Sequence, residues 1–297
     1  MRIRLAENFR AVFYAPFYAT LARGEFARQG LEVDLIDSAT PGSGTAALES
    51  GSIDVTWGGP MRAMKAWDGV GAPLVCFAEV VRRDPFYLVG RPSAAPLRLT
   101  DLAHLTLGSV SEVPTPWLCL QHDLREAGID PAAVRRIADR PMAQNLAAVA
   151  RGDLDLAQVF EPYASLAVEK GLEIRHAAAD RGPTSYTTFL TTPANLARHR
   201  RAFAAMTRAV AGMQRWLASA SGAEIAAAVA AYFPHLSPAV LAAAFDRYKE
   251  RRVWAEDPAV SRQGFDRLAE SLRSGGFIRR SPDYESCVVD PLTSDAQ

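Results

Sequence analysis

Glycine and hydroxyl residues follow two apolar runs near the start of the chain, in a pattern that favours the binding of a small polar group. Gly42-Ser43-Gly44-Thr45 comes after the run 31–36, and Trp57-Gly58-Gly59 ends the run that begins at residue 53. Backbone N–H groups at the start of a helix point outward and attract an anion or a polar acceptor. Ligands of open α/β sheets bind beyond the carboxyl ends of the strands. The sequence therefore predicts a small-molecule site at the rim of a sheet.

Residues 42–47 also fit the dinucleotide-binding pattern Gly-x-Gly-x-x-Ala. That pattern follows the first strand of its fold and has an acidic residue about 20 positions later. Here the turn follows the second predicted strand, and position 62 is arginine. These differences disfavour a dehydrogenase, whereas the N–H groups of the turn can still bind a ligand. Ser111–Thr115 likewise places hydroxyl residues and backbone N–H groups at the start of a predicted helix. In both segments, the hydroxyls either contact a ligand or cap their own helix.

Aromatic and charged side chains are predicted at the same rims. Rings in the turns after strands can stack on a planar ligand, and Trp57 and Tyr186 are the leading candidates. Arg82 would bind a carboxylate or sulfonate through two hydrogen bonds, unless it forms an ion pair in an exposed turn. Glu161 would accept hydrogen bonds from an N–H group, unless it only stabilises the start of its helix. Arg62 is also predicted near a rim, but we do not predict that it contacts the ligand. The predicted ligand-binding residues are Asn8, Phe9, Tyr14, Ser43, Gly44, Thr45, Trp57, Gly58, Gly59, Arg82, Ser111, Glu112, Thr115, Phe160, Glu161 and Tyr186.

The sequence shows no pattern for catalysis or metal binding. It has no Gly-x-Ser-x-Gly motif for a nucleophilic serine, and its five histidines are scattered along the chain. Its three cysteines are widely spaced and form neither a metal-binding nor a disulfide pattern. We therefore predict no catalytic residue, no metal site and no cofactor.

The composition is that of an ordinary globular protein. A length of 297 residues favours two domains, and 49% of the residues are hydrophobic and 22% charged. The formal net charge is zero, which gives no reason to expect nucleic acid or an anionic membrane as a partner. No apolar run approaches the roughly 20 residues that span a bilayer. We expect no nucleic-acid partner and no direct insertion into a membrane.

Predicted strands alternate with helices in residues 1–90, and the alternation restarts after the proline-containing segment 91–96. Such alternation indicates mostly parallel sheets with helices on both faces. From Pro193 onward, apolar residues recur at intervals of three and four, which predicts helices. We therefore predict an α/β fold with two lobes and a ligand cleft between them. Lobe one comprises residues 1–90 plus 187–297 with the C-terminal helices, and lobe two comprises residues 91–186.

An ordered set of segments resembles the periplasmic solute-binding proteins of ABC importers. These segments are 14–19, 24–33, 51–55, 99–102 and 124–131. The closer branch is the one shared with thiamine-pyrimidine synthase proteins and with sulfonate-, nitrate- and formylaminopyrimidine-binding proteins. The resemblance implies a type II periplasmic-binding-protein fold, in which two lobes joined by two crossing segments close over the ligand. It also implies a periplasmic location and a membrane permease as partner, and we expect a monomer.

Some proteins of this fold are enzymes, and the chain lacks their residues. Where the pyrimidine synthases have a histidine, this chain has Pro60-Met61-Arg62, and where they have a cysteine-rich run it has Thr184–Thr188. We therefore predict a solute-binding protein for ABC import. Its ligand would be a small planar polar molecule, either a pyrimidine-like heterocycle or an aromatic or sulfonate-type anion.

The first residues leave an alternative open. Residues 1–7 are already predicted as the first strand, without the basic start, apolar stretch and cleavage site of a secretory leader. Either a leader has been removed, or the protein stays in the cytoplasm. In the second case, the alternative hypothesis is a leaderless cytoplasmic enzyme that acts on a heteroaromatic metabolite.

Overall fold

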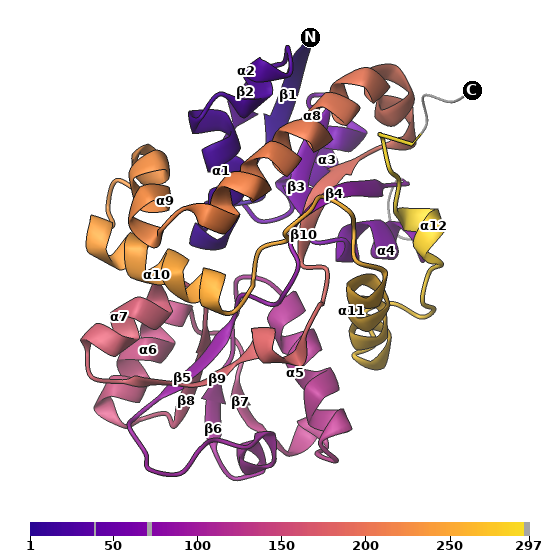
Figure 1. The fold of residues 1–297 in the computed structure, drawn as a ribbon. Coiled ribbons are helices and arrows are strands. Elements are labelled where there is room, and N and C mark those ends of the chain that lie inside the picture. The colour runs from indigo at the N-terminus through magenta and orange to yellow at the C-terminus, as the bar shows by residue number, and fades with distance from the viewer. Residues whose placement is uncertain (39, 70–72, 294–297) are drawn as a thin grey trace.

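Two five-stranded sheets organise the chain in the computed structural model, which describes residues 1–38, 40–69 and 73–293 (Figure 1). The strand order is β2-β1-β3-β10-β4 in the first sheet and β7-β6-β8-β5-β9 in the second. The strands of the first sheet are β1 (Arg2–Ala6), β2 (Glu32–Ile36), β3 (Val55–Gly58), β4 (Val75–Val81) and β10 (Thr187–Thr191). Those of the second are β5 (Tyr87–Gly90), β6 (Thr106–Gly108), β7 (Arg135–Ile137), β8 (Leu156–Val159) and β9 (Glu173–Ala177).

Helices connect the strands and continue after the last one. The helices between strands of the first sheet are α1 (Ala15–Ala22), α2 (Glu25–Arg28), α3 (Ser43–Glu49) and α4 (Met61–Trp67), with the 3-10 helix η1 (Val12–Tyr14). The second sheet has α5 (Thr115–Glu126), α6 (Met142–Arg151) and α7 (Tyr163–Glu169), with η2 (Leu99–Ala103), η3 (Pro131–Ala133) and η4 (Ala178–Arg181). The C-terminal part forms α8 (Pro193–Ser219), α9 (Gly222–Val229), η5 (Ala230–Tyr232), α10 (Pro238–Glu250), α11 (Arg262–Ser274) and α12 (Tyr284–Cys287). No helix in the described part of the chain combines the length and apolar character needed to cross a membrane.

One antiparallel strand occupies the same position in each sheet. β10 runs antiparallel to β3 and β4, and β5 runs antiparallel to β8 and β9. The remaining pairs, β1 with β2 and β3 and β6 with β7 and β8, are parallel. The chain enters the second sheet through β5, after β4 of the first sheet, and returns to the first sheet through β10, after β9 of the second. The predicted pair of mixed, mostly parallel sheets with flanking helices is confirmed.

The chain crosses between the sheets at residues 82–86 and 178–186, and backbone hydrogen bonds hold the two crossings side by side. The Thr184 N–H donates to the Arg82 carbonyl at 2.8 Å. The Ala178 N–H donates to the Phe86 carbonyl at 3.0 Å.

The predicted boundary after residue 90 is wrong, because β5 belongs to the second sheet. All four residues of β5 are buried, and the strand pairs with β8 and β9. The proline-containing segment 91–96, after which the predicted alternation restarts, is an exposed stretch that follows β5. β8 and β9 pair with the two edges of β5, so its backbone is hydrogen-bonded on both sides within the second sheet.

The C-terminal helices contact elements of both sheets, although the sequence assigned them to the first alone. α10 packs against α7, and α11 packs against both α4 and α5. Arg247 of α10 forms an ion pair with Glu161, which follows β8. After α11, a Cβ added to Gly275 would lie 2.6 Å from Leu118 Cδ2 of α5, so a larger residue there would require the Leu118 side chain to shift. Figure 1 shows α10 and α11 at the level between the two sheets.

A buried arginine joins the two crossings to α5. Arg181, in the second crossing, pairs with Asp84 of the first crossing at 2.5 Å and with Asp123 of α5. The three side chains are at most 7% exposed. Burial raises the pKa of Asp84, which the Arg181 charge opposes. These contacts fix α5 relative to both crossings.

Candidate ligand-binding site

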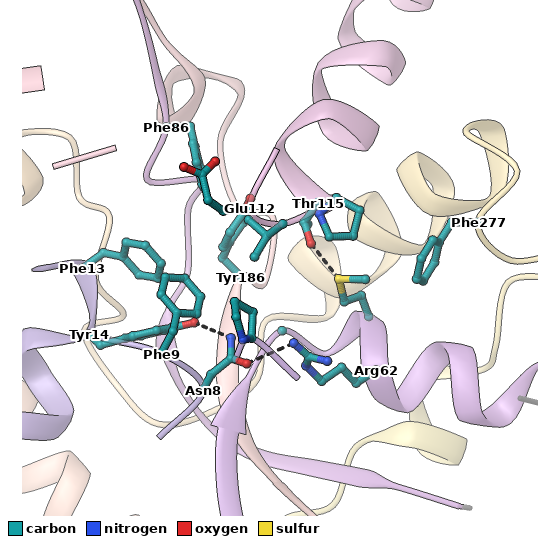
Figure 2. Close-up of a pocket in the computed structure, with 15 residues that line it drawn as sticks. Asn8, Phe9, Phe13, Tyr14, Arg62, Phe86, Glu112, Thr115, Tyr186 and Phe277 are labelled. Carbon is teal, nitrogen blue, oxygen red and sulfur yellow. Dashed lines mark hydrogen bonds between the residues drawn. The ribbon is translucent and has the colours of Figure 1, made fainter. Parts of the chain in front are cut away.

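A cavity of about 230 Å³ lies where elements of the two sheets meet (Figure 2). The loop after β1, η1 and the turn between β3 and α4 line it from the first sheet, and the loop between β6 and α5 lines it from the second. Both crossings and the segment after α11 complete the lining. The lining residues are Asn8, Phe9, Phe13, Tyr14, Pro41, Gly59, Met61, Arg62, Phe86, Glu112, Val113, Pro114, Thr115, Tyr186 and Phe277.

Asn8 connects three segments around this cavity. Its Oδ1 accepts hydrogen bonds from Arg62 Nη2 at 3.0 Å and from the Gly42 N–H at 2.9 Å. Its Nδ2 donates to the Tyr14 hydroxyl at 3.1 Å. Asn8 is 5% exposed, so these bonds replace the water that the amide would otherwise bind. The amide therefore sets the positions of the side chains around it (Figure 2).

Arg62 supplies a positive charge to the cavity. The residue is half-buried, and burial lowers the pKa of its guanidinium. The bond to Asn8 is its one side-chain hydrogen bond within the described residues, and no described carboxylate forms an ion pair with it. A partly desolvated guanidinium without an acidic partner is poised to bind an external anion.

The start of α5 faces Arg62 from the other sheet. α5 has Pro114 at its N-cap position, with no side-chain hydrogen bond to the first turn, so the Thr115 and Trp117 N–H groups remain uncapped by a side chain. The Thr115 hydroxyl donates to Met61 Sδ at 2.6 Å, a contact between the two sheets' elements. The helix start adds partial positive charge on the side of the cavity formed by the second sheet.

Aromatic rings form the apolar part of the lining. Phe9 packs edge-on against Tyr14, with ring centroids 5.4 Å apart, and Phe86 lies 6.0 Å from Tyr186. Burial raises the pKa of Tyr14 to about 12, against the hydrogen bond from Asn8, which lowers it. Burial also raises the pKa of Tyr186 well above its ordinary value, and the Tyr186 hydroxyl has no hydrogen-bond partner in the described part of the chain. Both phenols therefore stay neutral at physiological pH.

Seven of the predicted residues line this cavity. They are Asn8, Phe9, Tyr14, Gly59, Glu112, Thr115 and Tyr186. The loops after β1 and β3 and the loop before α5 lie at the rims where the sequence placed the site. Whether these side chains contact a ligand stays a prediction.

The glycine-rich turn lies beside the cavity rather than in its lining. Gly42 has φ +92°, and a Cβ there would lie 2.7 Å from Arg62 Nη1. A Cβ at Gly44 would lie 2.6 Å from Thr56 Oγ1, so Gly44 lets α3 approach β3. A Cβ at Gly58 would lie 3.2 Å from Arg62 Nε. These glycines therefore make room for packing and for Arg62.

Of the two hydroxyls in that turn, only that of Ser43 has a hydrogen-bond partner among the described residues. Ser43 Oγ lies 2.5 Å from Ser38 Oγ, and Thr45 Oγ1 is buried without a described partner. Neither residue lines the cavity.

Trp57 and Phe160 are packing residues rather than lining residues. Trp57 lies within β3 and is fully buried, and its ring stacks on Phe17 at 4.6 Å. Phe160 packs edge-on against Phe13 and Phe86, each at 5.3 Å, and supports these lining rings from behind. The sequence placed Trp57 at a strand end, whereas β3 continues through it.

Three further residues that the sequence predicted as ligand contacts instead bind other residues of the protein. Arg82 pairs with Glu79 at 2.6 Å and with Asp257 at 3.1 Å. Glu161 is fully buried and pairs with Arg247. Ser111 is hydrogen-bonded to the Glu112 carboxylate. None of these three predicted residues lines the cavity of about 230 Å³.

Sequence reasoning missed several lining residues. Arg62 is the second residue of α4, where a cation opposes the helix dipole, and this mismatch is a signal that could have identified it. Phe277 comes from the far end of the chain, and no local pattern marks it. The other missed residues are Phe13, Pro41, Met61, Phe86, Val113 and Pro114.

The lining of this cavity includes two charged side chains. These are Arg62 and Glu112. No histidine or cysteine is among the described residues that line the cavity. In residues 1–38, 40–69 and 73–293, no group of three or more His, Cys, Asp or Glu side chains could hold a metal ion.

Two comparisons by sequence find a matching family and a similar curated protein. The model of the NMT1-like family matches residues 9–231. The protein named "Putative binding protein YtlA", from Bacillus subtilis (strain 168), is 26% identical over 295 residues, which are 97% of this chain and 87% of that protein.

Solved structures share the fold over nearly the whole chain. The periplasmic aliphatic sulphonate binding protein SsuA from Escherichia coli has a TM-score of 0.76 at 15% identity, and the match covers 96% of each chain. The ligand-binding component of an ABC-type import system from Staphylococcus aureus, solved with zinc bound, has a TM-score of 0.75 at 15% identity, covering 100% of this chain and 99% of that one. These likenesses confirm the predicted periplasmic-binding-protein fold. Because the family match spans more than half of the sequence, the chain belongs to the NMT1-like family.

Proposed function

We propose that the protein is a solute-binding protein of an ABC importer and that it captures a small acid with a planar ring. The observation that carries this proposal is Arg62, a guanidinium in the cavity lining that has no ion-pair partner among the described residues. A permanent positive charge in such a place favours a negatively charged ligand over a neutral one.

The acidic group of the ligand would lie between Arg62 and the start of α5. Arg62 can offer two parallel N–H donors to a carboxylate or sulfonate, in the fork geometry that such anions match. The uncapped N–H groups at Thr115 and Trp117 would face the same anion from the second sheet. Asn8 holds the guanidinium in place before the ligand arrives.

The planar part of the ligand would pack against the aromatic lining. Phe9, Phe13 and Tyr14 form one side of this lining and the two crossings supply Phe86 and Tyr186. Rings stack on rings or meet them edge-on with little loss of conformational entropy. A cavity of about 230 Å³ is smaller than the roughly 300–1,000 Å³ of sites for drug-sized ligands, which favours a small molecule.

Capture would be conformational. A ligand that touches both Arg62 and the start of α5 bridges the two sheets, which we take as two lobes, and stabilises the arrangement in which they are close. The crossings at 82–86 and 178–186 would absorb the movement as a hinge. A membrane permease would then receive the loaded protein, and the likeness to the SsuA and Staphylococcus aureus structures supports this role and a periplasmic location.

Isothermal titration calorimetry with matched small aromatic compounds tests the proposal. Benzoate and benzenesulfonate carry the acidic group, whereas benzamide and pyrimidine have a similar ring without the charge. We expect the acids to bind at least about tenfold more tightly than the neutral compounds, as one charge-assisted contact predicts. Equal binding of acids and neutral rings, or no binding of either, would contradict the proposal.

A further inference from the structure

A second cavity, of about 420 Å³, lies next to the first. Glu112, Val113, Pro114 and Phe277 line both cavities, so the two cavities adjoin along a shared border of these four residues. The second cavity also receives residues from the end of β7, the first turn of α5 and the segment after α11. The loop before α5, the first turn of α5 and the segment after α11 therefore contribute to both cavities, whereas β7 contributes to the second alone.

Arg136 is the basic residue in the lining of this second cavity, and the described chain leaves it partly unpartnered. Its Nε donates to Ser109 Oγ at 2.7 Å, and its guanidinium carbon lies 4.3 Å from the centroid of the Trp117 ring. Its two terminal amino groups make no hydrogen bond to the described residues, and no described carboxylate pairs with it. Arg136 is exposed to solvent, and the partial burial of its guanidinium lowers its pKa.

The contacts of Arg136 fix its orientation and leave its donors open. The guanidinium lies over the Trp117 ring in a cation–π contact, and the bond to Ser109 holds its Nε edge. The terminal amino groups remain available to an anion, and a guanidinium oriented in this way loses little entropy when it binds a carboxylate.

We propose that the second cavity is an outer subsite of the same binding site, where Arg136 binds a second acidic group, so that the ligand is an elongated aromatic diacid. This inference rests on the proposed function, in which Arg62 binds the first acidic group. The two arginines then hold the two ends of one molecule.

Glu112, on the border that the two cavities share, restricts the middle of such a ligand. Its carboxylate accepts hydrogen bonds from the Ser111 N–H at 3.0 Å and the Met142 N–H at 3.1 Å, and it keeps unshared acceptor capacity. A negative charge here would repel an acidic group near the middle of the ligand. The ligand should therefore carry its acidic groups at its ends and an uncharged or N–H-bearing part between them.

Calorimetry with matched monoacids and diacids tests the inference. The probes are benzoate with benzene-1,4-dicarboxylate, and 2-naphthoate with naphthalene-2,6-dicarboxylate. The full chain is compared with Arg136→Gln and with the control Arg135→Gln, which changes the same residue type one position earlier in β7. Arg135 lines neither cavity and donates to the His104 carbonyl.

We expect at least one diacid to bind about tenfold more tightly than its monoacid, as one additional charge-assisted contact predicts. Arg136→Gln should remove this difference and leave monoacid affinity unchanged, and Arg135→Gln should preserve the difference. If monoacids bind but no diacid binds more tightly, the outer subsite is wrong and the proposed function stands. Equal losses for both acids in Arg136→Gln would assign Arg136 a structural role and overturn the inference. If no acid binds, both proposals fall.

Discussion

Arg62 Nη2 donates a hydrogen bond to Asn8 Oδ1 at 3.0 Å, and this contact joins the loop after β1 to the start of α4. The same oxygen accepts the Gly42 N–H at 2.9 Å, so a third segment is held by one amide. The result is a guanidinium that is fixed in direction, partly desolvated and without a described acidic partner. Such preorganisation reduces the entropy that anion binding would cost.

Replacing Asn8 should weaken binding and stability together. Asn8→Ala leaves the Gly42 N–H without its partner and releases Arg62, so the free energy of unfolding should fall by about 1–3 kcal/mol. Affinity for benzoate should fall as well. Asn195→Ala is the control, since it removes contacts to the Ile53 and Asp54 carbonyls away from the cavity. Urea denaturation and calorimetry measure both quantities, and an Asn8→Ala variant with unchanged affinity would refute the positioning role.

Gly42 and Gly24 form a matched pair for separating backbone strain from contact with Arg62. Both have positive φ, +92° and +70°, but only a Cβ at Gly42 would meet Arg62, at 2.7 Å, whereas a Cβ at Gly24 has nothing within 4 Å. Each alanine variant should lose about 1–2 kcal/mol of stability from the left-handed backbone. Gly42→Ala alone should reduce affinity for benzoate, because it displaces the guanidinium. Equal affinities of the two variants would show that Gly42 does not control Arg62.

Trp57 should matter for folding and not for binding. Its ring is fully buried against Phe17, so Trp57→Ala should lower the free energy of unfolding by about 3–5 kcal/mol. Trp57→Phe keeps an apolar ring in the core, and its affinity for benzoate should match that of the parent protein. A tenfold loss of affinity in Trp57→Phe at unchanged stability would instead place Trp57 at the ligand.

Acid should destabilise the first sheet through Asp54. Burial alone raises the pKa of Asp54, but hydrogen bonds from the Arg4 side chain and backbone outweigh it and hold the pKa below the ordinary value of 3.8. The folded state therefore binds fewer protons than the unfolded state, so this stabilisation is present above pH 3.8 and is lost as the pH falls through the folded pKa. Urea denaturation at pH 5 and pH 3 should show a smaller drop for Asp54→Asn and for Arg4→Gln than for the parent protein. Parallel drops in all three proteins would contradict this assignment.

Much of the fold follows from local patterns. The alternation of apolar runs with glycine-ended helices predicts strands such as β1 and β3 and helices such as α3, because each pattern is complete within about ten residues. Residues 48–55 and 149–156 share a pattern, in which a helix end is followed by a glycine and an apolar run that contains an aspartate, and this similarity predicts that α3–β3 and α6–β8 are equivalent units. The boundary near residue 90 was beyond local reasoning, since an apolar strand does not encode which sheet will bury it.

The site is harder to predict because it depends on side-chain direction. Arg62 and Arg82 are both near a rim in the sequence, but the first turn of α4 directs Arg62 into the cavity, while Glu79 and Asp257 hold Arg82. Asp257 is 175 residues from Arg82, so no local pattern reveals this pairing. Phe277 enters the lining for a similar reason, because α11 packs across α4 and α5.

Comparing two arginine variants tests the central claim most directly. Arg62→Gln removes the charge in the cavity, whereas Arg82→Gln removes a charge of the same type that is paired elsewhere. Calorimetry with benzoate, at conditions where both variants remain folded, should show that Arg62→Gln loses affinity by about 10- to 100-fold, because a charge-assisted contact is lost. Arg82→Gln should keep the affinity of the parent protein. Parental affinity in Arg62→Gln, or the larger loss in Arg82→Gln, would contradict an anion site at Arg62.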